Sequence, residues 1–169
     1  TGSFKIRGIG HACRRRRAAG ARAFVASSGG NAGLAVAYAG RQLGVPVSIV
    51  IPTTTPELTR SRLQAEGAQV VVHGGVWDEA HLHALEISEA TPGAAYIHPF
   101  DDEEVWAGHA SLVHELAADG FAPDLIVTVV GGGGLLCGIL QGLHDKGWAK
   151  VPVLTVETVG ADCFARSVA

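Results

Sequence analysis

The chain has 169 residues, of which 47% are hydrophobic, and a formal net charge of −3. This length allows one domain or two small ones, with enough apolar residues for a sizeable core. The negative charge argues against nucleic acid or an anionic membrane as a general partner. No apolar run reaches the roughly 18 residues that a membrane-spanning helix needs.

The compartment and the completeness of the chain are also predicted from simple features. The first residues do not form a signal peptide. Cys13, Cys137 and Cys163 are odd in number and lack C-x-x-C spacing, so we expect buried thiols in a cytoplasmic protein. The chain opens at a helix start and stops within an expected helix, which predicts a fragment that lacks parts on both sides.

The first expected helix covers about 5–19, and its start carries an unusually placed lysine. Ser3 is the expected N-cap, which puts Lys5 in the first turn at the positive end of the helix dipole. Phe4 beside it suggests partial burial, which also disfavours a charged amine. Both effects predict a lowered pKa and a nucleophilic amine. The alternative is an ordinary surface lysine near a helix start.

A short strand at 21–26 precedes the loop 27–33, which leads into an alanine-rich helix that ends near Gly44. Ser28 offers a hydroxyl, Asn31 offers a side-chain amide, and the glycines expose backbone N–H groups. Such a loop suits a carboxylate or an aromatic ring oxygen. The alternative is an ordinary helix cap provided by Ser28.

Strands and helices continue to alternate. We expect strands at 47–51, 70–73, 95–97, 125–130 and 153–156, and helices at about 56–67, 77–91, 101–119 and 135–146. Thr55 should cap the first of these helices with Pro56 at its first position, and Asp101 or Asp102 should cap the third. The alternation predicts an α/β protein with a mostly parallel sheet. Pro46 and Pro52 suggest that roughly 32–98 form a small sheet of their own.

Four consecutive glycines, 131–134, separate an apolar strand from a helix. The strand, at 125–130, is expected to be buried on both faces. Glycines let several backbone N–H groups point at one anion, and the helix dipole adds to the field, so the loop predicts a phosphate site. Glu157 ends the next strand, where a dinucleotide fold keeps its ribose-binding acid, so a nicotinamide enzyme is an alternative.

The histidines do not predict a metal site. His81 and His83 lie two residues apart, which points them to different sides of a helix. His109 and His114 are also badly spaced to share a metal. The three tryptophans are expected to be packing residues, some of them half-buried.

Three motifs occur in the order seen in fold-type II pyridoxal-phosphate enzymes: 3–8, 28–33 and 131–135. Further matches resemble the serine/threonine dehydratase family, and within it the liver-type L-serine dehydratases: 99–102, Trp106, 108–111, 131–138 and 157–161. The resemblance covers essentially the whole chain. It implies a three-layer αβα fold with mostly parallel sheets. Residues 1–31 and 99–169 would then be parts of a large cofactor-binding domain, and 32–98 a small domain.

The resemblance also implies roles for the first part of the chain. Lys5 would hold pyridoxal phosphate as a Schiff base, Phe4 would lie against the pyridine ring, and Asn31 would hydrogen-bond the 3-oxygen of the ring. The substrate carboxylate would lie among Ser28, Gly29 and Ala32.

In the second part of the chain, backbone amides would bind the cofactor phosphate, namely those of Gly131, Gly132, Gly133, Gly134 and Leu135. Gly131, Glu157 and Ala161 resemble part of a monovalent-cation site, which would hold K⁺. The family's partner of the ring nitrogen is absent from these residues. A homodimer is what the family implies.

The implied reaction converts L-serine to pyruvate and ammonia, and L-threonine to 2-oxobutyrate and ammonia. Lys5, once displaced by the substrate amine, would remove the α-proton, and the cofactor phosphate would protonate the leaving hydroxyl. Serine racemases of this fold have a serine where this chain has Gly29, so racemisation should be weak. A serine racemase or another β-replacing enzyme, a nicotinamide-dependent oxidoreductase and a non-enzymatic binding module remain alternatives.

Overall fold

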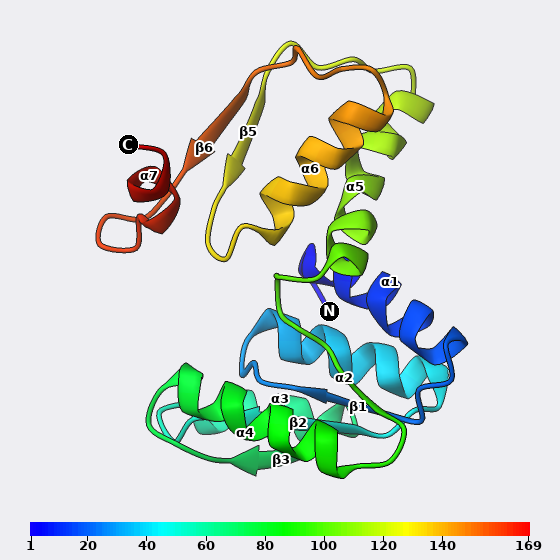
Figure 1. The fold of residues 1–169 in the computed structure, drawn as a ribbon, viewed down its shortest axis with the longest axis vertical. Coiled ribbons are helices and arrows are strands. Elements are labelled where there is room, and N and C mark those ends of the chain that lie inside the picture. Colours follow the sequence, from blue (N-terminus) through cyan, green and yellow to red (C-terminus); the bar gives the residue numbers. More distant parts are fainter. The chain divides into compact units, whose positions relative to one another are not determined.

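The computed structural model describes residues 1–169, which form two compact units, Thr1–Pro99 and Phe100–Ala169 (Figure 1). The predicted alternation of strands and helices is confirmed. The first unit contains α1 (Lys5–Ala18), β1 (Ala23–Ala26), α2 (Asn31–Leu43), β2 (Val47–Ile51), α3 (Glu57–Ala65), β3 (Gln69–Val72), α4 (Trp77–Ala90) and β4 (Ala94–Tyr96). The second contains α5 (Glu103–Ala118), β5 (Ile126–Val129), α6 (Gly134–Asp145), β6 (Val153–Val156) and α7 (Cys163–Val168).

The first unit is built on one parallel sheet with the strand order β3-β2-β1-β4. Strand β1 lies between β2 and β4, and its Val25 is paired with Ser48 on one side and Tyr96 on the other. The loop that follows β1 therefore leaves the centre of the sheet. This is the place where the strand order reverses, and where open parallel sheets bind ligands.

Helices cover both faces of this sheet because its side chains alternate between the faces. On one face, Ala80 and Ala84 of α4 pack against Val25 and Val50. On the other, α2 approaches β2 so closely that a Cβ at Gly40 would lie 2.1 Å from Val47 Cγ2. The layered arrangement with mostly parallel sheets is thus the predicted one.

The second unit packs α5 and α6 on a two-stranded parallel sheet of β5 and β6. Its core contains Val113 of α5 and Ile139 and Leu143 of α6, with Ile126 and Val153 of the strands packed against them. Glycines allow the two helices to approach closely, because a Cβ at Gly138 would lie 2.4 Å from His109 Cβ.

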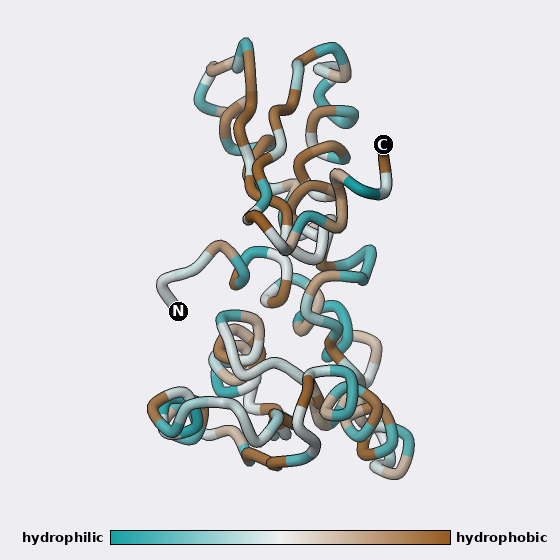
Figure 2. Tube along the Cα trace, turned by 90° about the vertical axis from the view of Figure 1, so that its left-hand side faces the viewer, coloured by the Kyte–Doolittle hydropathy of each residue, from teal (hydrophilic) through white to brown (hydrophobic).

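The prediction that the strand near 125–130 is buried on both faces is wrong for this chain. Val127 and Val129 are 60% and 62% exposed. The helices of the unit pack against the side of the sheet that carries Ile126, and the alternate residues point away from it. Figure 2 shows that hydrophobic residues dominate both strands, so the exposed positions are apolar as well.

Helix caps differ from the prediction by about one residue. The N-cap of α1 is Phe4, although the Ser3 hydroxyl does accept a hydrogen bond from the Lys5 backbone N–H (3.3 Å). The N-cap of α3 is Pro56 instead of Thr55. The prediction for α5 is confirmed, since Asp102 caps it by accepting from the Glu104 N–H at 2.8 Å.

The sheet of the first unit also differs from the prediction that 32–98 form a sheet of their own. Strand β1, which lies outside that range, is a central strand of the sheet. The assignment of the segments to a large and a small domain of a longer protein stays a prediction.

The cysteines were expected to be buried, and only Cys13 is, whereas Cys163 is exposed. None of the helices combines the length and apolar character needed to cross a lipid bilayer.

Candidate functional site

Lys5 is the first residue of α1, and its amine lies in a partly buried environment. Its Nζ donates a hydrogen bond of 2.6 Å to the carbonyl oxygen of Pro99. Burial lowers the pKa of this amine below its ordinary value, as predicted. Phe4 is 39% exposed, and the centre of its ring lies 5.5 Å from Lys5 Nζ. An amine with a lowered pKa in this setting is suited to attack a carbonyl carbon and to accept a proton.

The loop after β1 turns tightly into α2. The Ser28 hydroxyl accepts a hydrogen bond from the Gly30 N–H (3.3 Å), and Gly30 is the N-cap of α2. Ser28 is therefore not the helix cap of the alternative interpretation. A Cβ at Gly33 would lie 1.8 Å from the Ser28 carbonyl oxygen, so only glycine allows this approach.

The residues of this loop that are predicted to bind a ligand differ from one another in exposure and in the space around them. Asn31 is exposed at the first position of α2, so its side-chain amide is open to solvent. Ala32 is 4% exposed, so it offers its backbone and not its side chain. Gly29 has little free space, because a Cβ there would lie 2.8 Å from Thr55 Cγ2. The loop and the helix N-terminus together suit a carboxylate or a polar ring oxygen.

Three of the four glycines after β5, Gly132, Gly133 and Gly134, are required by their backbone conformation or by close neighbours. Gly133, the N-cap of α6, has a φ of +84°, which other residues rarely adopt. A Cβ at Gly132 would lie 2.4–2.6 Å from three atoms of the Phe100 ring. A Cβ at Gly134 would lie 2.5 Å from the Phe100 carbonyl oxygen. Phe100 therefore excludes side chains from this part of the loop.

The same loop leaves a set of donors available. The first backbone bond of α6 runs from the Cys137 N–H to the Gly133 carbonyl at 2.9 Å. The N–H groups of the preceding residues, from Gly131 to Leu136, donate no backbone hydrogen bond. Several N–H groups at a helix N-terminus are the donor set that a phosphate prefers, so the residues present fit a phosphorylated cofactor.

The residues predicted to hold a monovalent cation lie near the end of β6. Gly131 and Ala161 line a cavity of about 300 Å³ together with Gly160, Asp162, Cys163 and Arg166. The carboxylate of Glu157 accepts hydrogen bonds from the N–H groups of Phe164 (3.0 Å) and Ala165 (2.8 Å). It therefore stabilises the start of α7. No cluster of three or more His, Cys, Asp or Glu side chains could hold a metal ion.

The histidine side chains contact different groups. His81 Nδ1 is hydrogen-bonded to the Tyr96 hydroxyl (2.7 Å), whereas His83 Nδ1 lies 2.9 Å from Glu86 Oε2. His109 is fully buried and His114 pairs with Asp145.

The sequence did not predict the contacts that four residues make at these sites: Ser27, Tyr96, Pro99 and Phe100. Pro99 and Phe100 belong to a motif that carried the family resemblance, but nothing in that motif indicates a contact with Lys5 or with the glycine loop. Ser27 and Tyr96 come together only through the pairing of β1 with β4. Each compact unit thus carries part of the predicted set, with Lys5 and Asn31 in the first and the glycine loop in the second.

Comparison with known proteins extends these observations. The family model described as "Pyridoxal-phosphate dependent enzyme" matches residues 1–169. The L-serine dehydratase/L-threonine deaminase of Homo sapiens is 55% identical over 97% of this chain and 50% of its own length. That of Mus musculus is 53% identical over 99% and 52%. The chain therefore spans about half the length of these curated relatives.

Solved structures give the same picture. A fungal L-serine ammonia-lyase from Rhizomucor miehei has a TM-score of 0.90 and 37% identity, covering 99% of this chain and 54% of that one. A serine racemase from Dictyostelium discoideum has a TM-score of 0.86 and 31% identity, covering 99% of this chain and 54% of that one.

Proposed function

Because this chain belongs to the family of pyridoxal-phosphate dependent enzymes, we propose that the protein containing it is an ammonia-lyase. It converts L-serine to pyruvate and ammonia, and L-threonine to 2-oxobutyrate and ammonia. The observation that carries the proposal is the partly buried amine of Lys5, whose pKa is lowered, at the start of α1. The names and the identity of the dehydratase relatives support the choice of reaction.

Pyridoxal phosphate, when bound, supplies an electron sink that stabilises negative charge at the α-carbon of an amino acid. Lys5 would hold the cofactor through its amine, beside the Phe4 ring. The open N–H groups of Gly131, Gly132, Gly133, Gly134 and Leu135 would bind the phosphate, and Asn31 would hydrogen-bond the 3-oxygen.

The remaining roles fall to side chains and backbone groups of this chain. A neutral Lys5 amine can accept the α-proton of the substrate, because its lowered pKa leaves a larger uncharged fraction near neutral pH. Ser28, Gly29 and Ala32, at the N-terminus of α2, would bind the substrate carboxylate. A Cβ at Gly29 would lie 2.8 Å from Thr55 Cγ2 and one at Gly33 1.8 Å from the Ser28 carbonyl oxygen, so the turn keeps its conformation only with glycine at both positions.

Three finer points belong to the same proposal. Gly131, Glu157 and Ala161 would contribute to a K⁺ site, and Gly131 and Ala161 line the cavity after β6. The protein would be cytoplasmic, in keeping with three cysteines that form no disulfide. It would act as a homodimer.

The test uses the complete protein that contains this chain, with Lys5→Ala and the matched control Lys146→Ala, which removes an exposed lysine. Lys5→Ala should abolish the visible absorbance of bound cofactor. It should also lower the release of pyruvate from L-serine by about 10²–10⁴-fold or more.

Borohydride reduction of the parent followed by peptide mapping should place the cofactor on Lys5. A parent protein that stays colourless with ample pyridoxal phosphate, or a label on Lys146 or Lys150, would contradict the proposal.

A further inference from the structure

Ser27 is a fully buried polar residue directly before the loop that leads to Asn31. A buried hydroxyl is costly unless it is hydrogen-bonded, so its partners fix its position. Ser27 lies between β1, which is paired on both sides, and residues 28–30, where the Ser28 hydroxyl accepts a hydrogen bond from the Gly30 N–H. The geometry of the loop therefore depends on how Ser27 is held.

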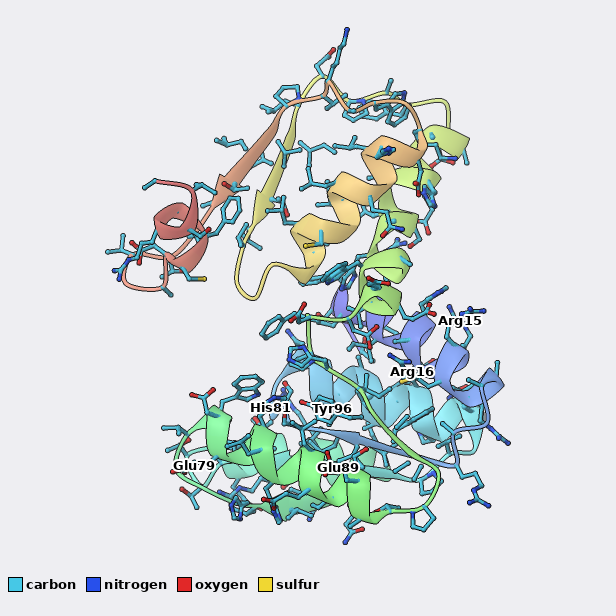
Figure 3. The ribbon with its side chains drawn as sticks, viewed as in Figure 1. Arg15, Arg16, Glu79, His81, Glu89 and Tyr96 are labelled. Carbon is cyan, nitrogen blue, oxygen red and sulfur yellow. The ribbon has the colours of Figure 1, made fainter.

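Two side chains from elsewhere in the fold hold the hydroxyl of Ser27. The Tyr96 hydroxyl, at the end of β4, lies 2.6 Å from Ser27 Oγ and 2.7 Å from His81 Nδ1 of α4. Figure 3 shows the His81 and Tyr96 side chains next to each other in the first unit. With a neutral His81 that accepts at Nδ1, the Tyr96 hydroxyl donates to His81, so the Ser27 hydroxyl must donate to Tyr96.

A third side chain holds the backbone of Ser27. Trp77 Nε1 donates a hydrogen bond of 2.6 Å to the Ser27 carbonyl oxygen. The Trp77 ring is stacked on His81, with 4.9 Å between the ring centres and 11° between the planes. Ser27 is thus fixed at two atoms by one connected cluster, and the next peptide group begins the loop.

The same segment also reaches the candidate cofactor lysine. Tyr96 contacts Ser27, and three residues further on the Pro99 carbonyl accepts the bond from Lys5 Nζ. The His98 ring, between them, packs edge-on against Trp77 at 6.2 Å and His81 at 5.6 Å. One short stretch after β4 therefore connects the loop, the aromatic cluster and the amine.

We propose that Trp77, His81 and Tyr96 are positioning residues that hold Ser27 and thereby set the geometry of Ser28–Asn31 for the substrate carboxylate. This inference rests on the function proposed above. The cluster does not touch the reacting atoms. Its loss should weaken substrate binding more than it slows the chemical step, because a displaced loop costs carboxylate contacts.

The first experiment compares Tyr96→Phe with Tyr38→Phe in the complete protein. Tyr38 lies on α2, away from Ser27, and the Arg41 guanidinium lies 5.4 Å from the centre of its ring. Tyr96→Phe should raise KM for L-serine about five- to tenfold with less than a twofold change in kcat, and Tyr38→Phe should leave both unchanged. Equal effects of the two variants, or a fall confined to kcat, would overturn the proposal.

The second experiment separates hydrogen bonding from packing at His81. Asn and Leu have similar size, but only the Asn amide can bond Tyr96 from near the position of Nδ1. His81→Asn should therefore keep KM within about twofold of the parent, and His81→Leu should raise it as Tyr96→Phe does. The same rise in both variants would overturn the role of the hydrogen bond.

A readout that needs no turnover is hydrogen exchange of the peptide covering 27–32, measured by mass spectrometry without substrate. Tyr96→Phe and His81→Leu should exchange faster than Tyr38→Phe and His81→Asn; equal rates would contradict the inference. If the parent fails to convert L-serine, the proposed function fails, whereas the exchange rates still decide whether this cluster holds the loop.

Discussion

The two loops that precede α2 and α6 share a topology and differ in how they are held. Each connects the carboxyl end of a parallel strand to the start of a helix. The loop before α2 is held by the hydrogen bonds that Tyr96 and Trp77 make with Ser27. The loop before α6 is fixed by close contact, with Phe100 against the backbone of Gly132 and Gly134.

The difference indicates what each loop can offer a ligand. Close contact with Phe100 leaves no room for side chains at Gly132 and Gly134, so this loop presents backbone N–H groups alone, which suit a phosphate. The loop before α2 carries Ser28 and Asn31, so it presents a hydroxyl and an amide. These groups suit a carboxylate and a ring oxygen, respectively. Adding a methyl group should therefore disturb the loop before α6, where Phe100 leaves no room. Removing a hydroxyl should disturb the loop before α2, where hydrogen bonds hold Ser27.

The largest effect is expected from Gly132→Ala. The new methyl group would lie 2.4–2.6 Å from the Phe100 ring, so the loop must shift. Such overpacking costs about 1–3 kcal/mol, and the affinity for pyridoxal phosphate should fall about 10–100-fold. Titration of the complete protein with the cofactor, followed by absorbance, measures this.

Gly131→Ala is the matched variant, because a Cβ there has no neighbour within 4 Å. It should change the free energy of unfolding by less than about 0.5 kcal/mol, as is usual for exposed positions. If both variants lose affinity equally, contact with Phe100 is not what holds the loop.

A smaller effect is expected from Gly29→Ser. The serine methylene would collide with Thr55, so the single variant should lose about 1–2 kcal/mol of stability and Gly29→Ser/Thr55→Ala should recover most of it. Chemical denaturation of the complete proteins measures both. The family resemblance implies a serine at this position in serine racemases, so the double variant should also form D-serine several-fold faster than the parent. Rapid racemisation by the parent would contradict the role given to Gly29.

The smallest effect is expected from a test that leaves the sequence unchanged and measures the reactivity of the Lys5 amine as a function of pH. Burial lowers the pKa of its amine below the ordinary 10.5, so a larger fraction is uncharged at every pH below that value. Acylation of Lys5 in the cofactor-free protein should therefore reach its plateau at lower pH than in an unfolded peptide covering 2–7. The difference should disappear only well above pH 10.5, where both amines are mostly neutral. Coincident profiles would show that burial does not tune this amine.

Much of the fold was predictable because its signals are local. The periodicity of apolar residues predicted the helices and strands. The pair Asp101-Asp102 predicted the cap of α5, which Asp102 provides. The four glycines predicted open N–H groups after β5, which the bonding pattern of α6 confirms. The expected partial burial of Lys5 beside Phe4 predicted the direction of its pKa shift.

By itself the sequence thus determined the elements, their alternation and the residue types at the two loops. The tertiary structure decided which distant groups meet them. The Pro99 carbonyl reaches Lys5 from 94 residues away, Phe100 excludes side chains from the glycine loop, and Tyr96 reaches Ser27 because β4 pairs with β1. It also decided that Val127 and Val129 are exposed. Apolar spacing specifies a local conformation, whereas the order of strands in a sheet specifies neighbours, and spacing alone does not carry that order.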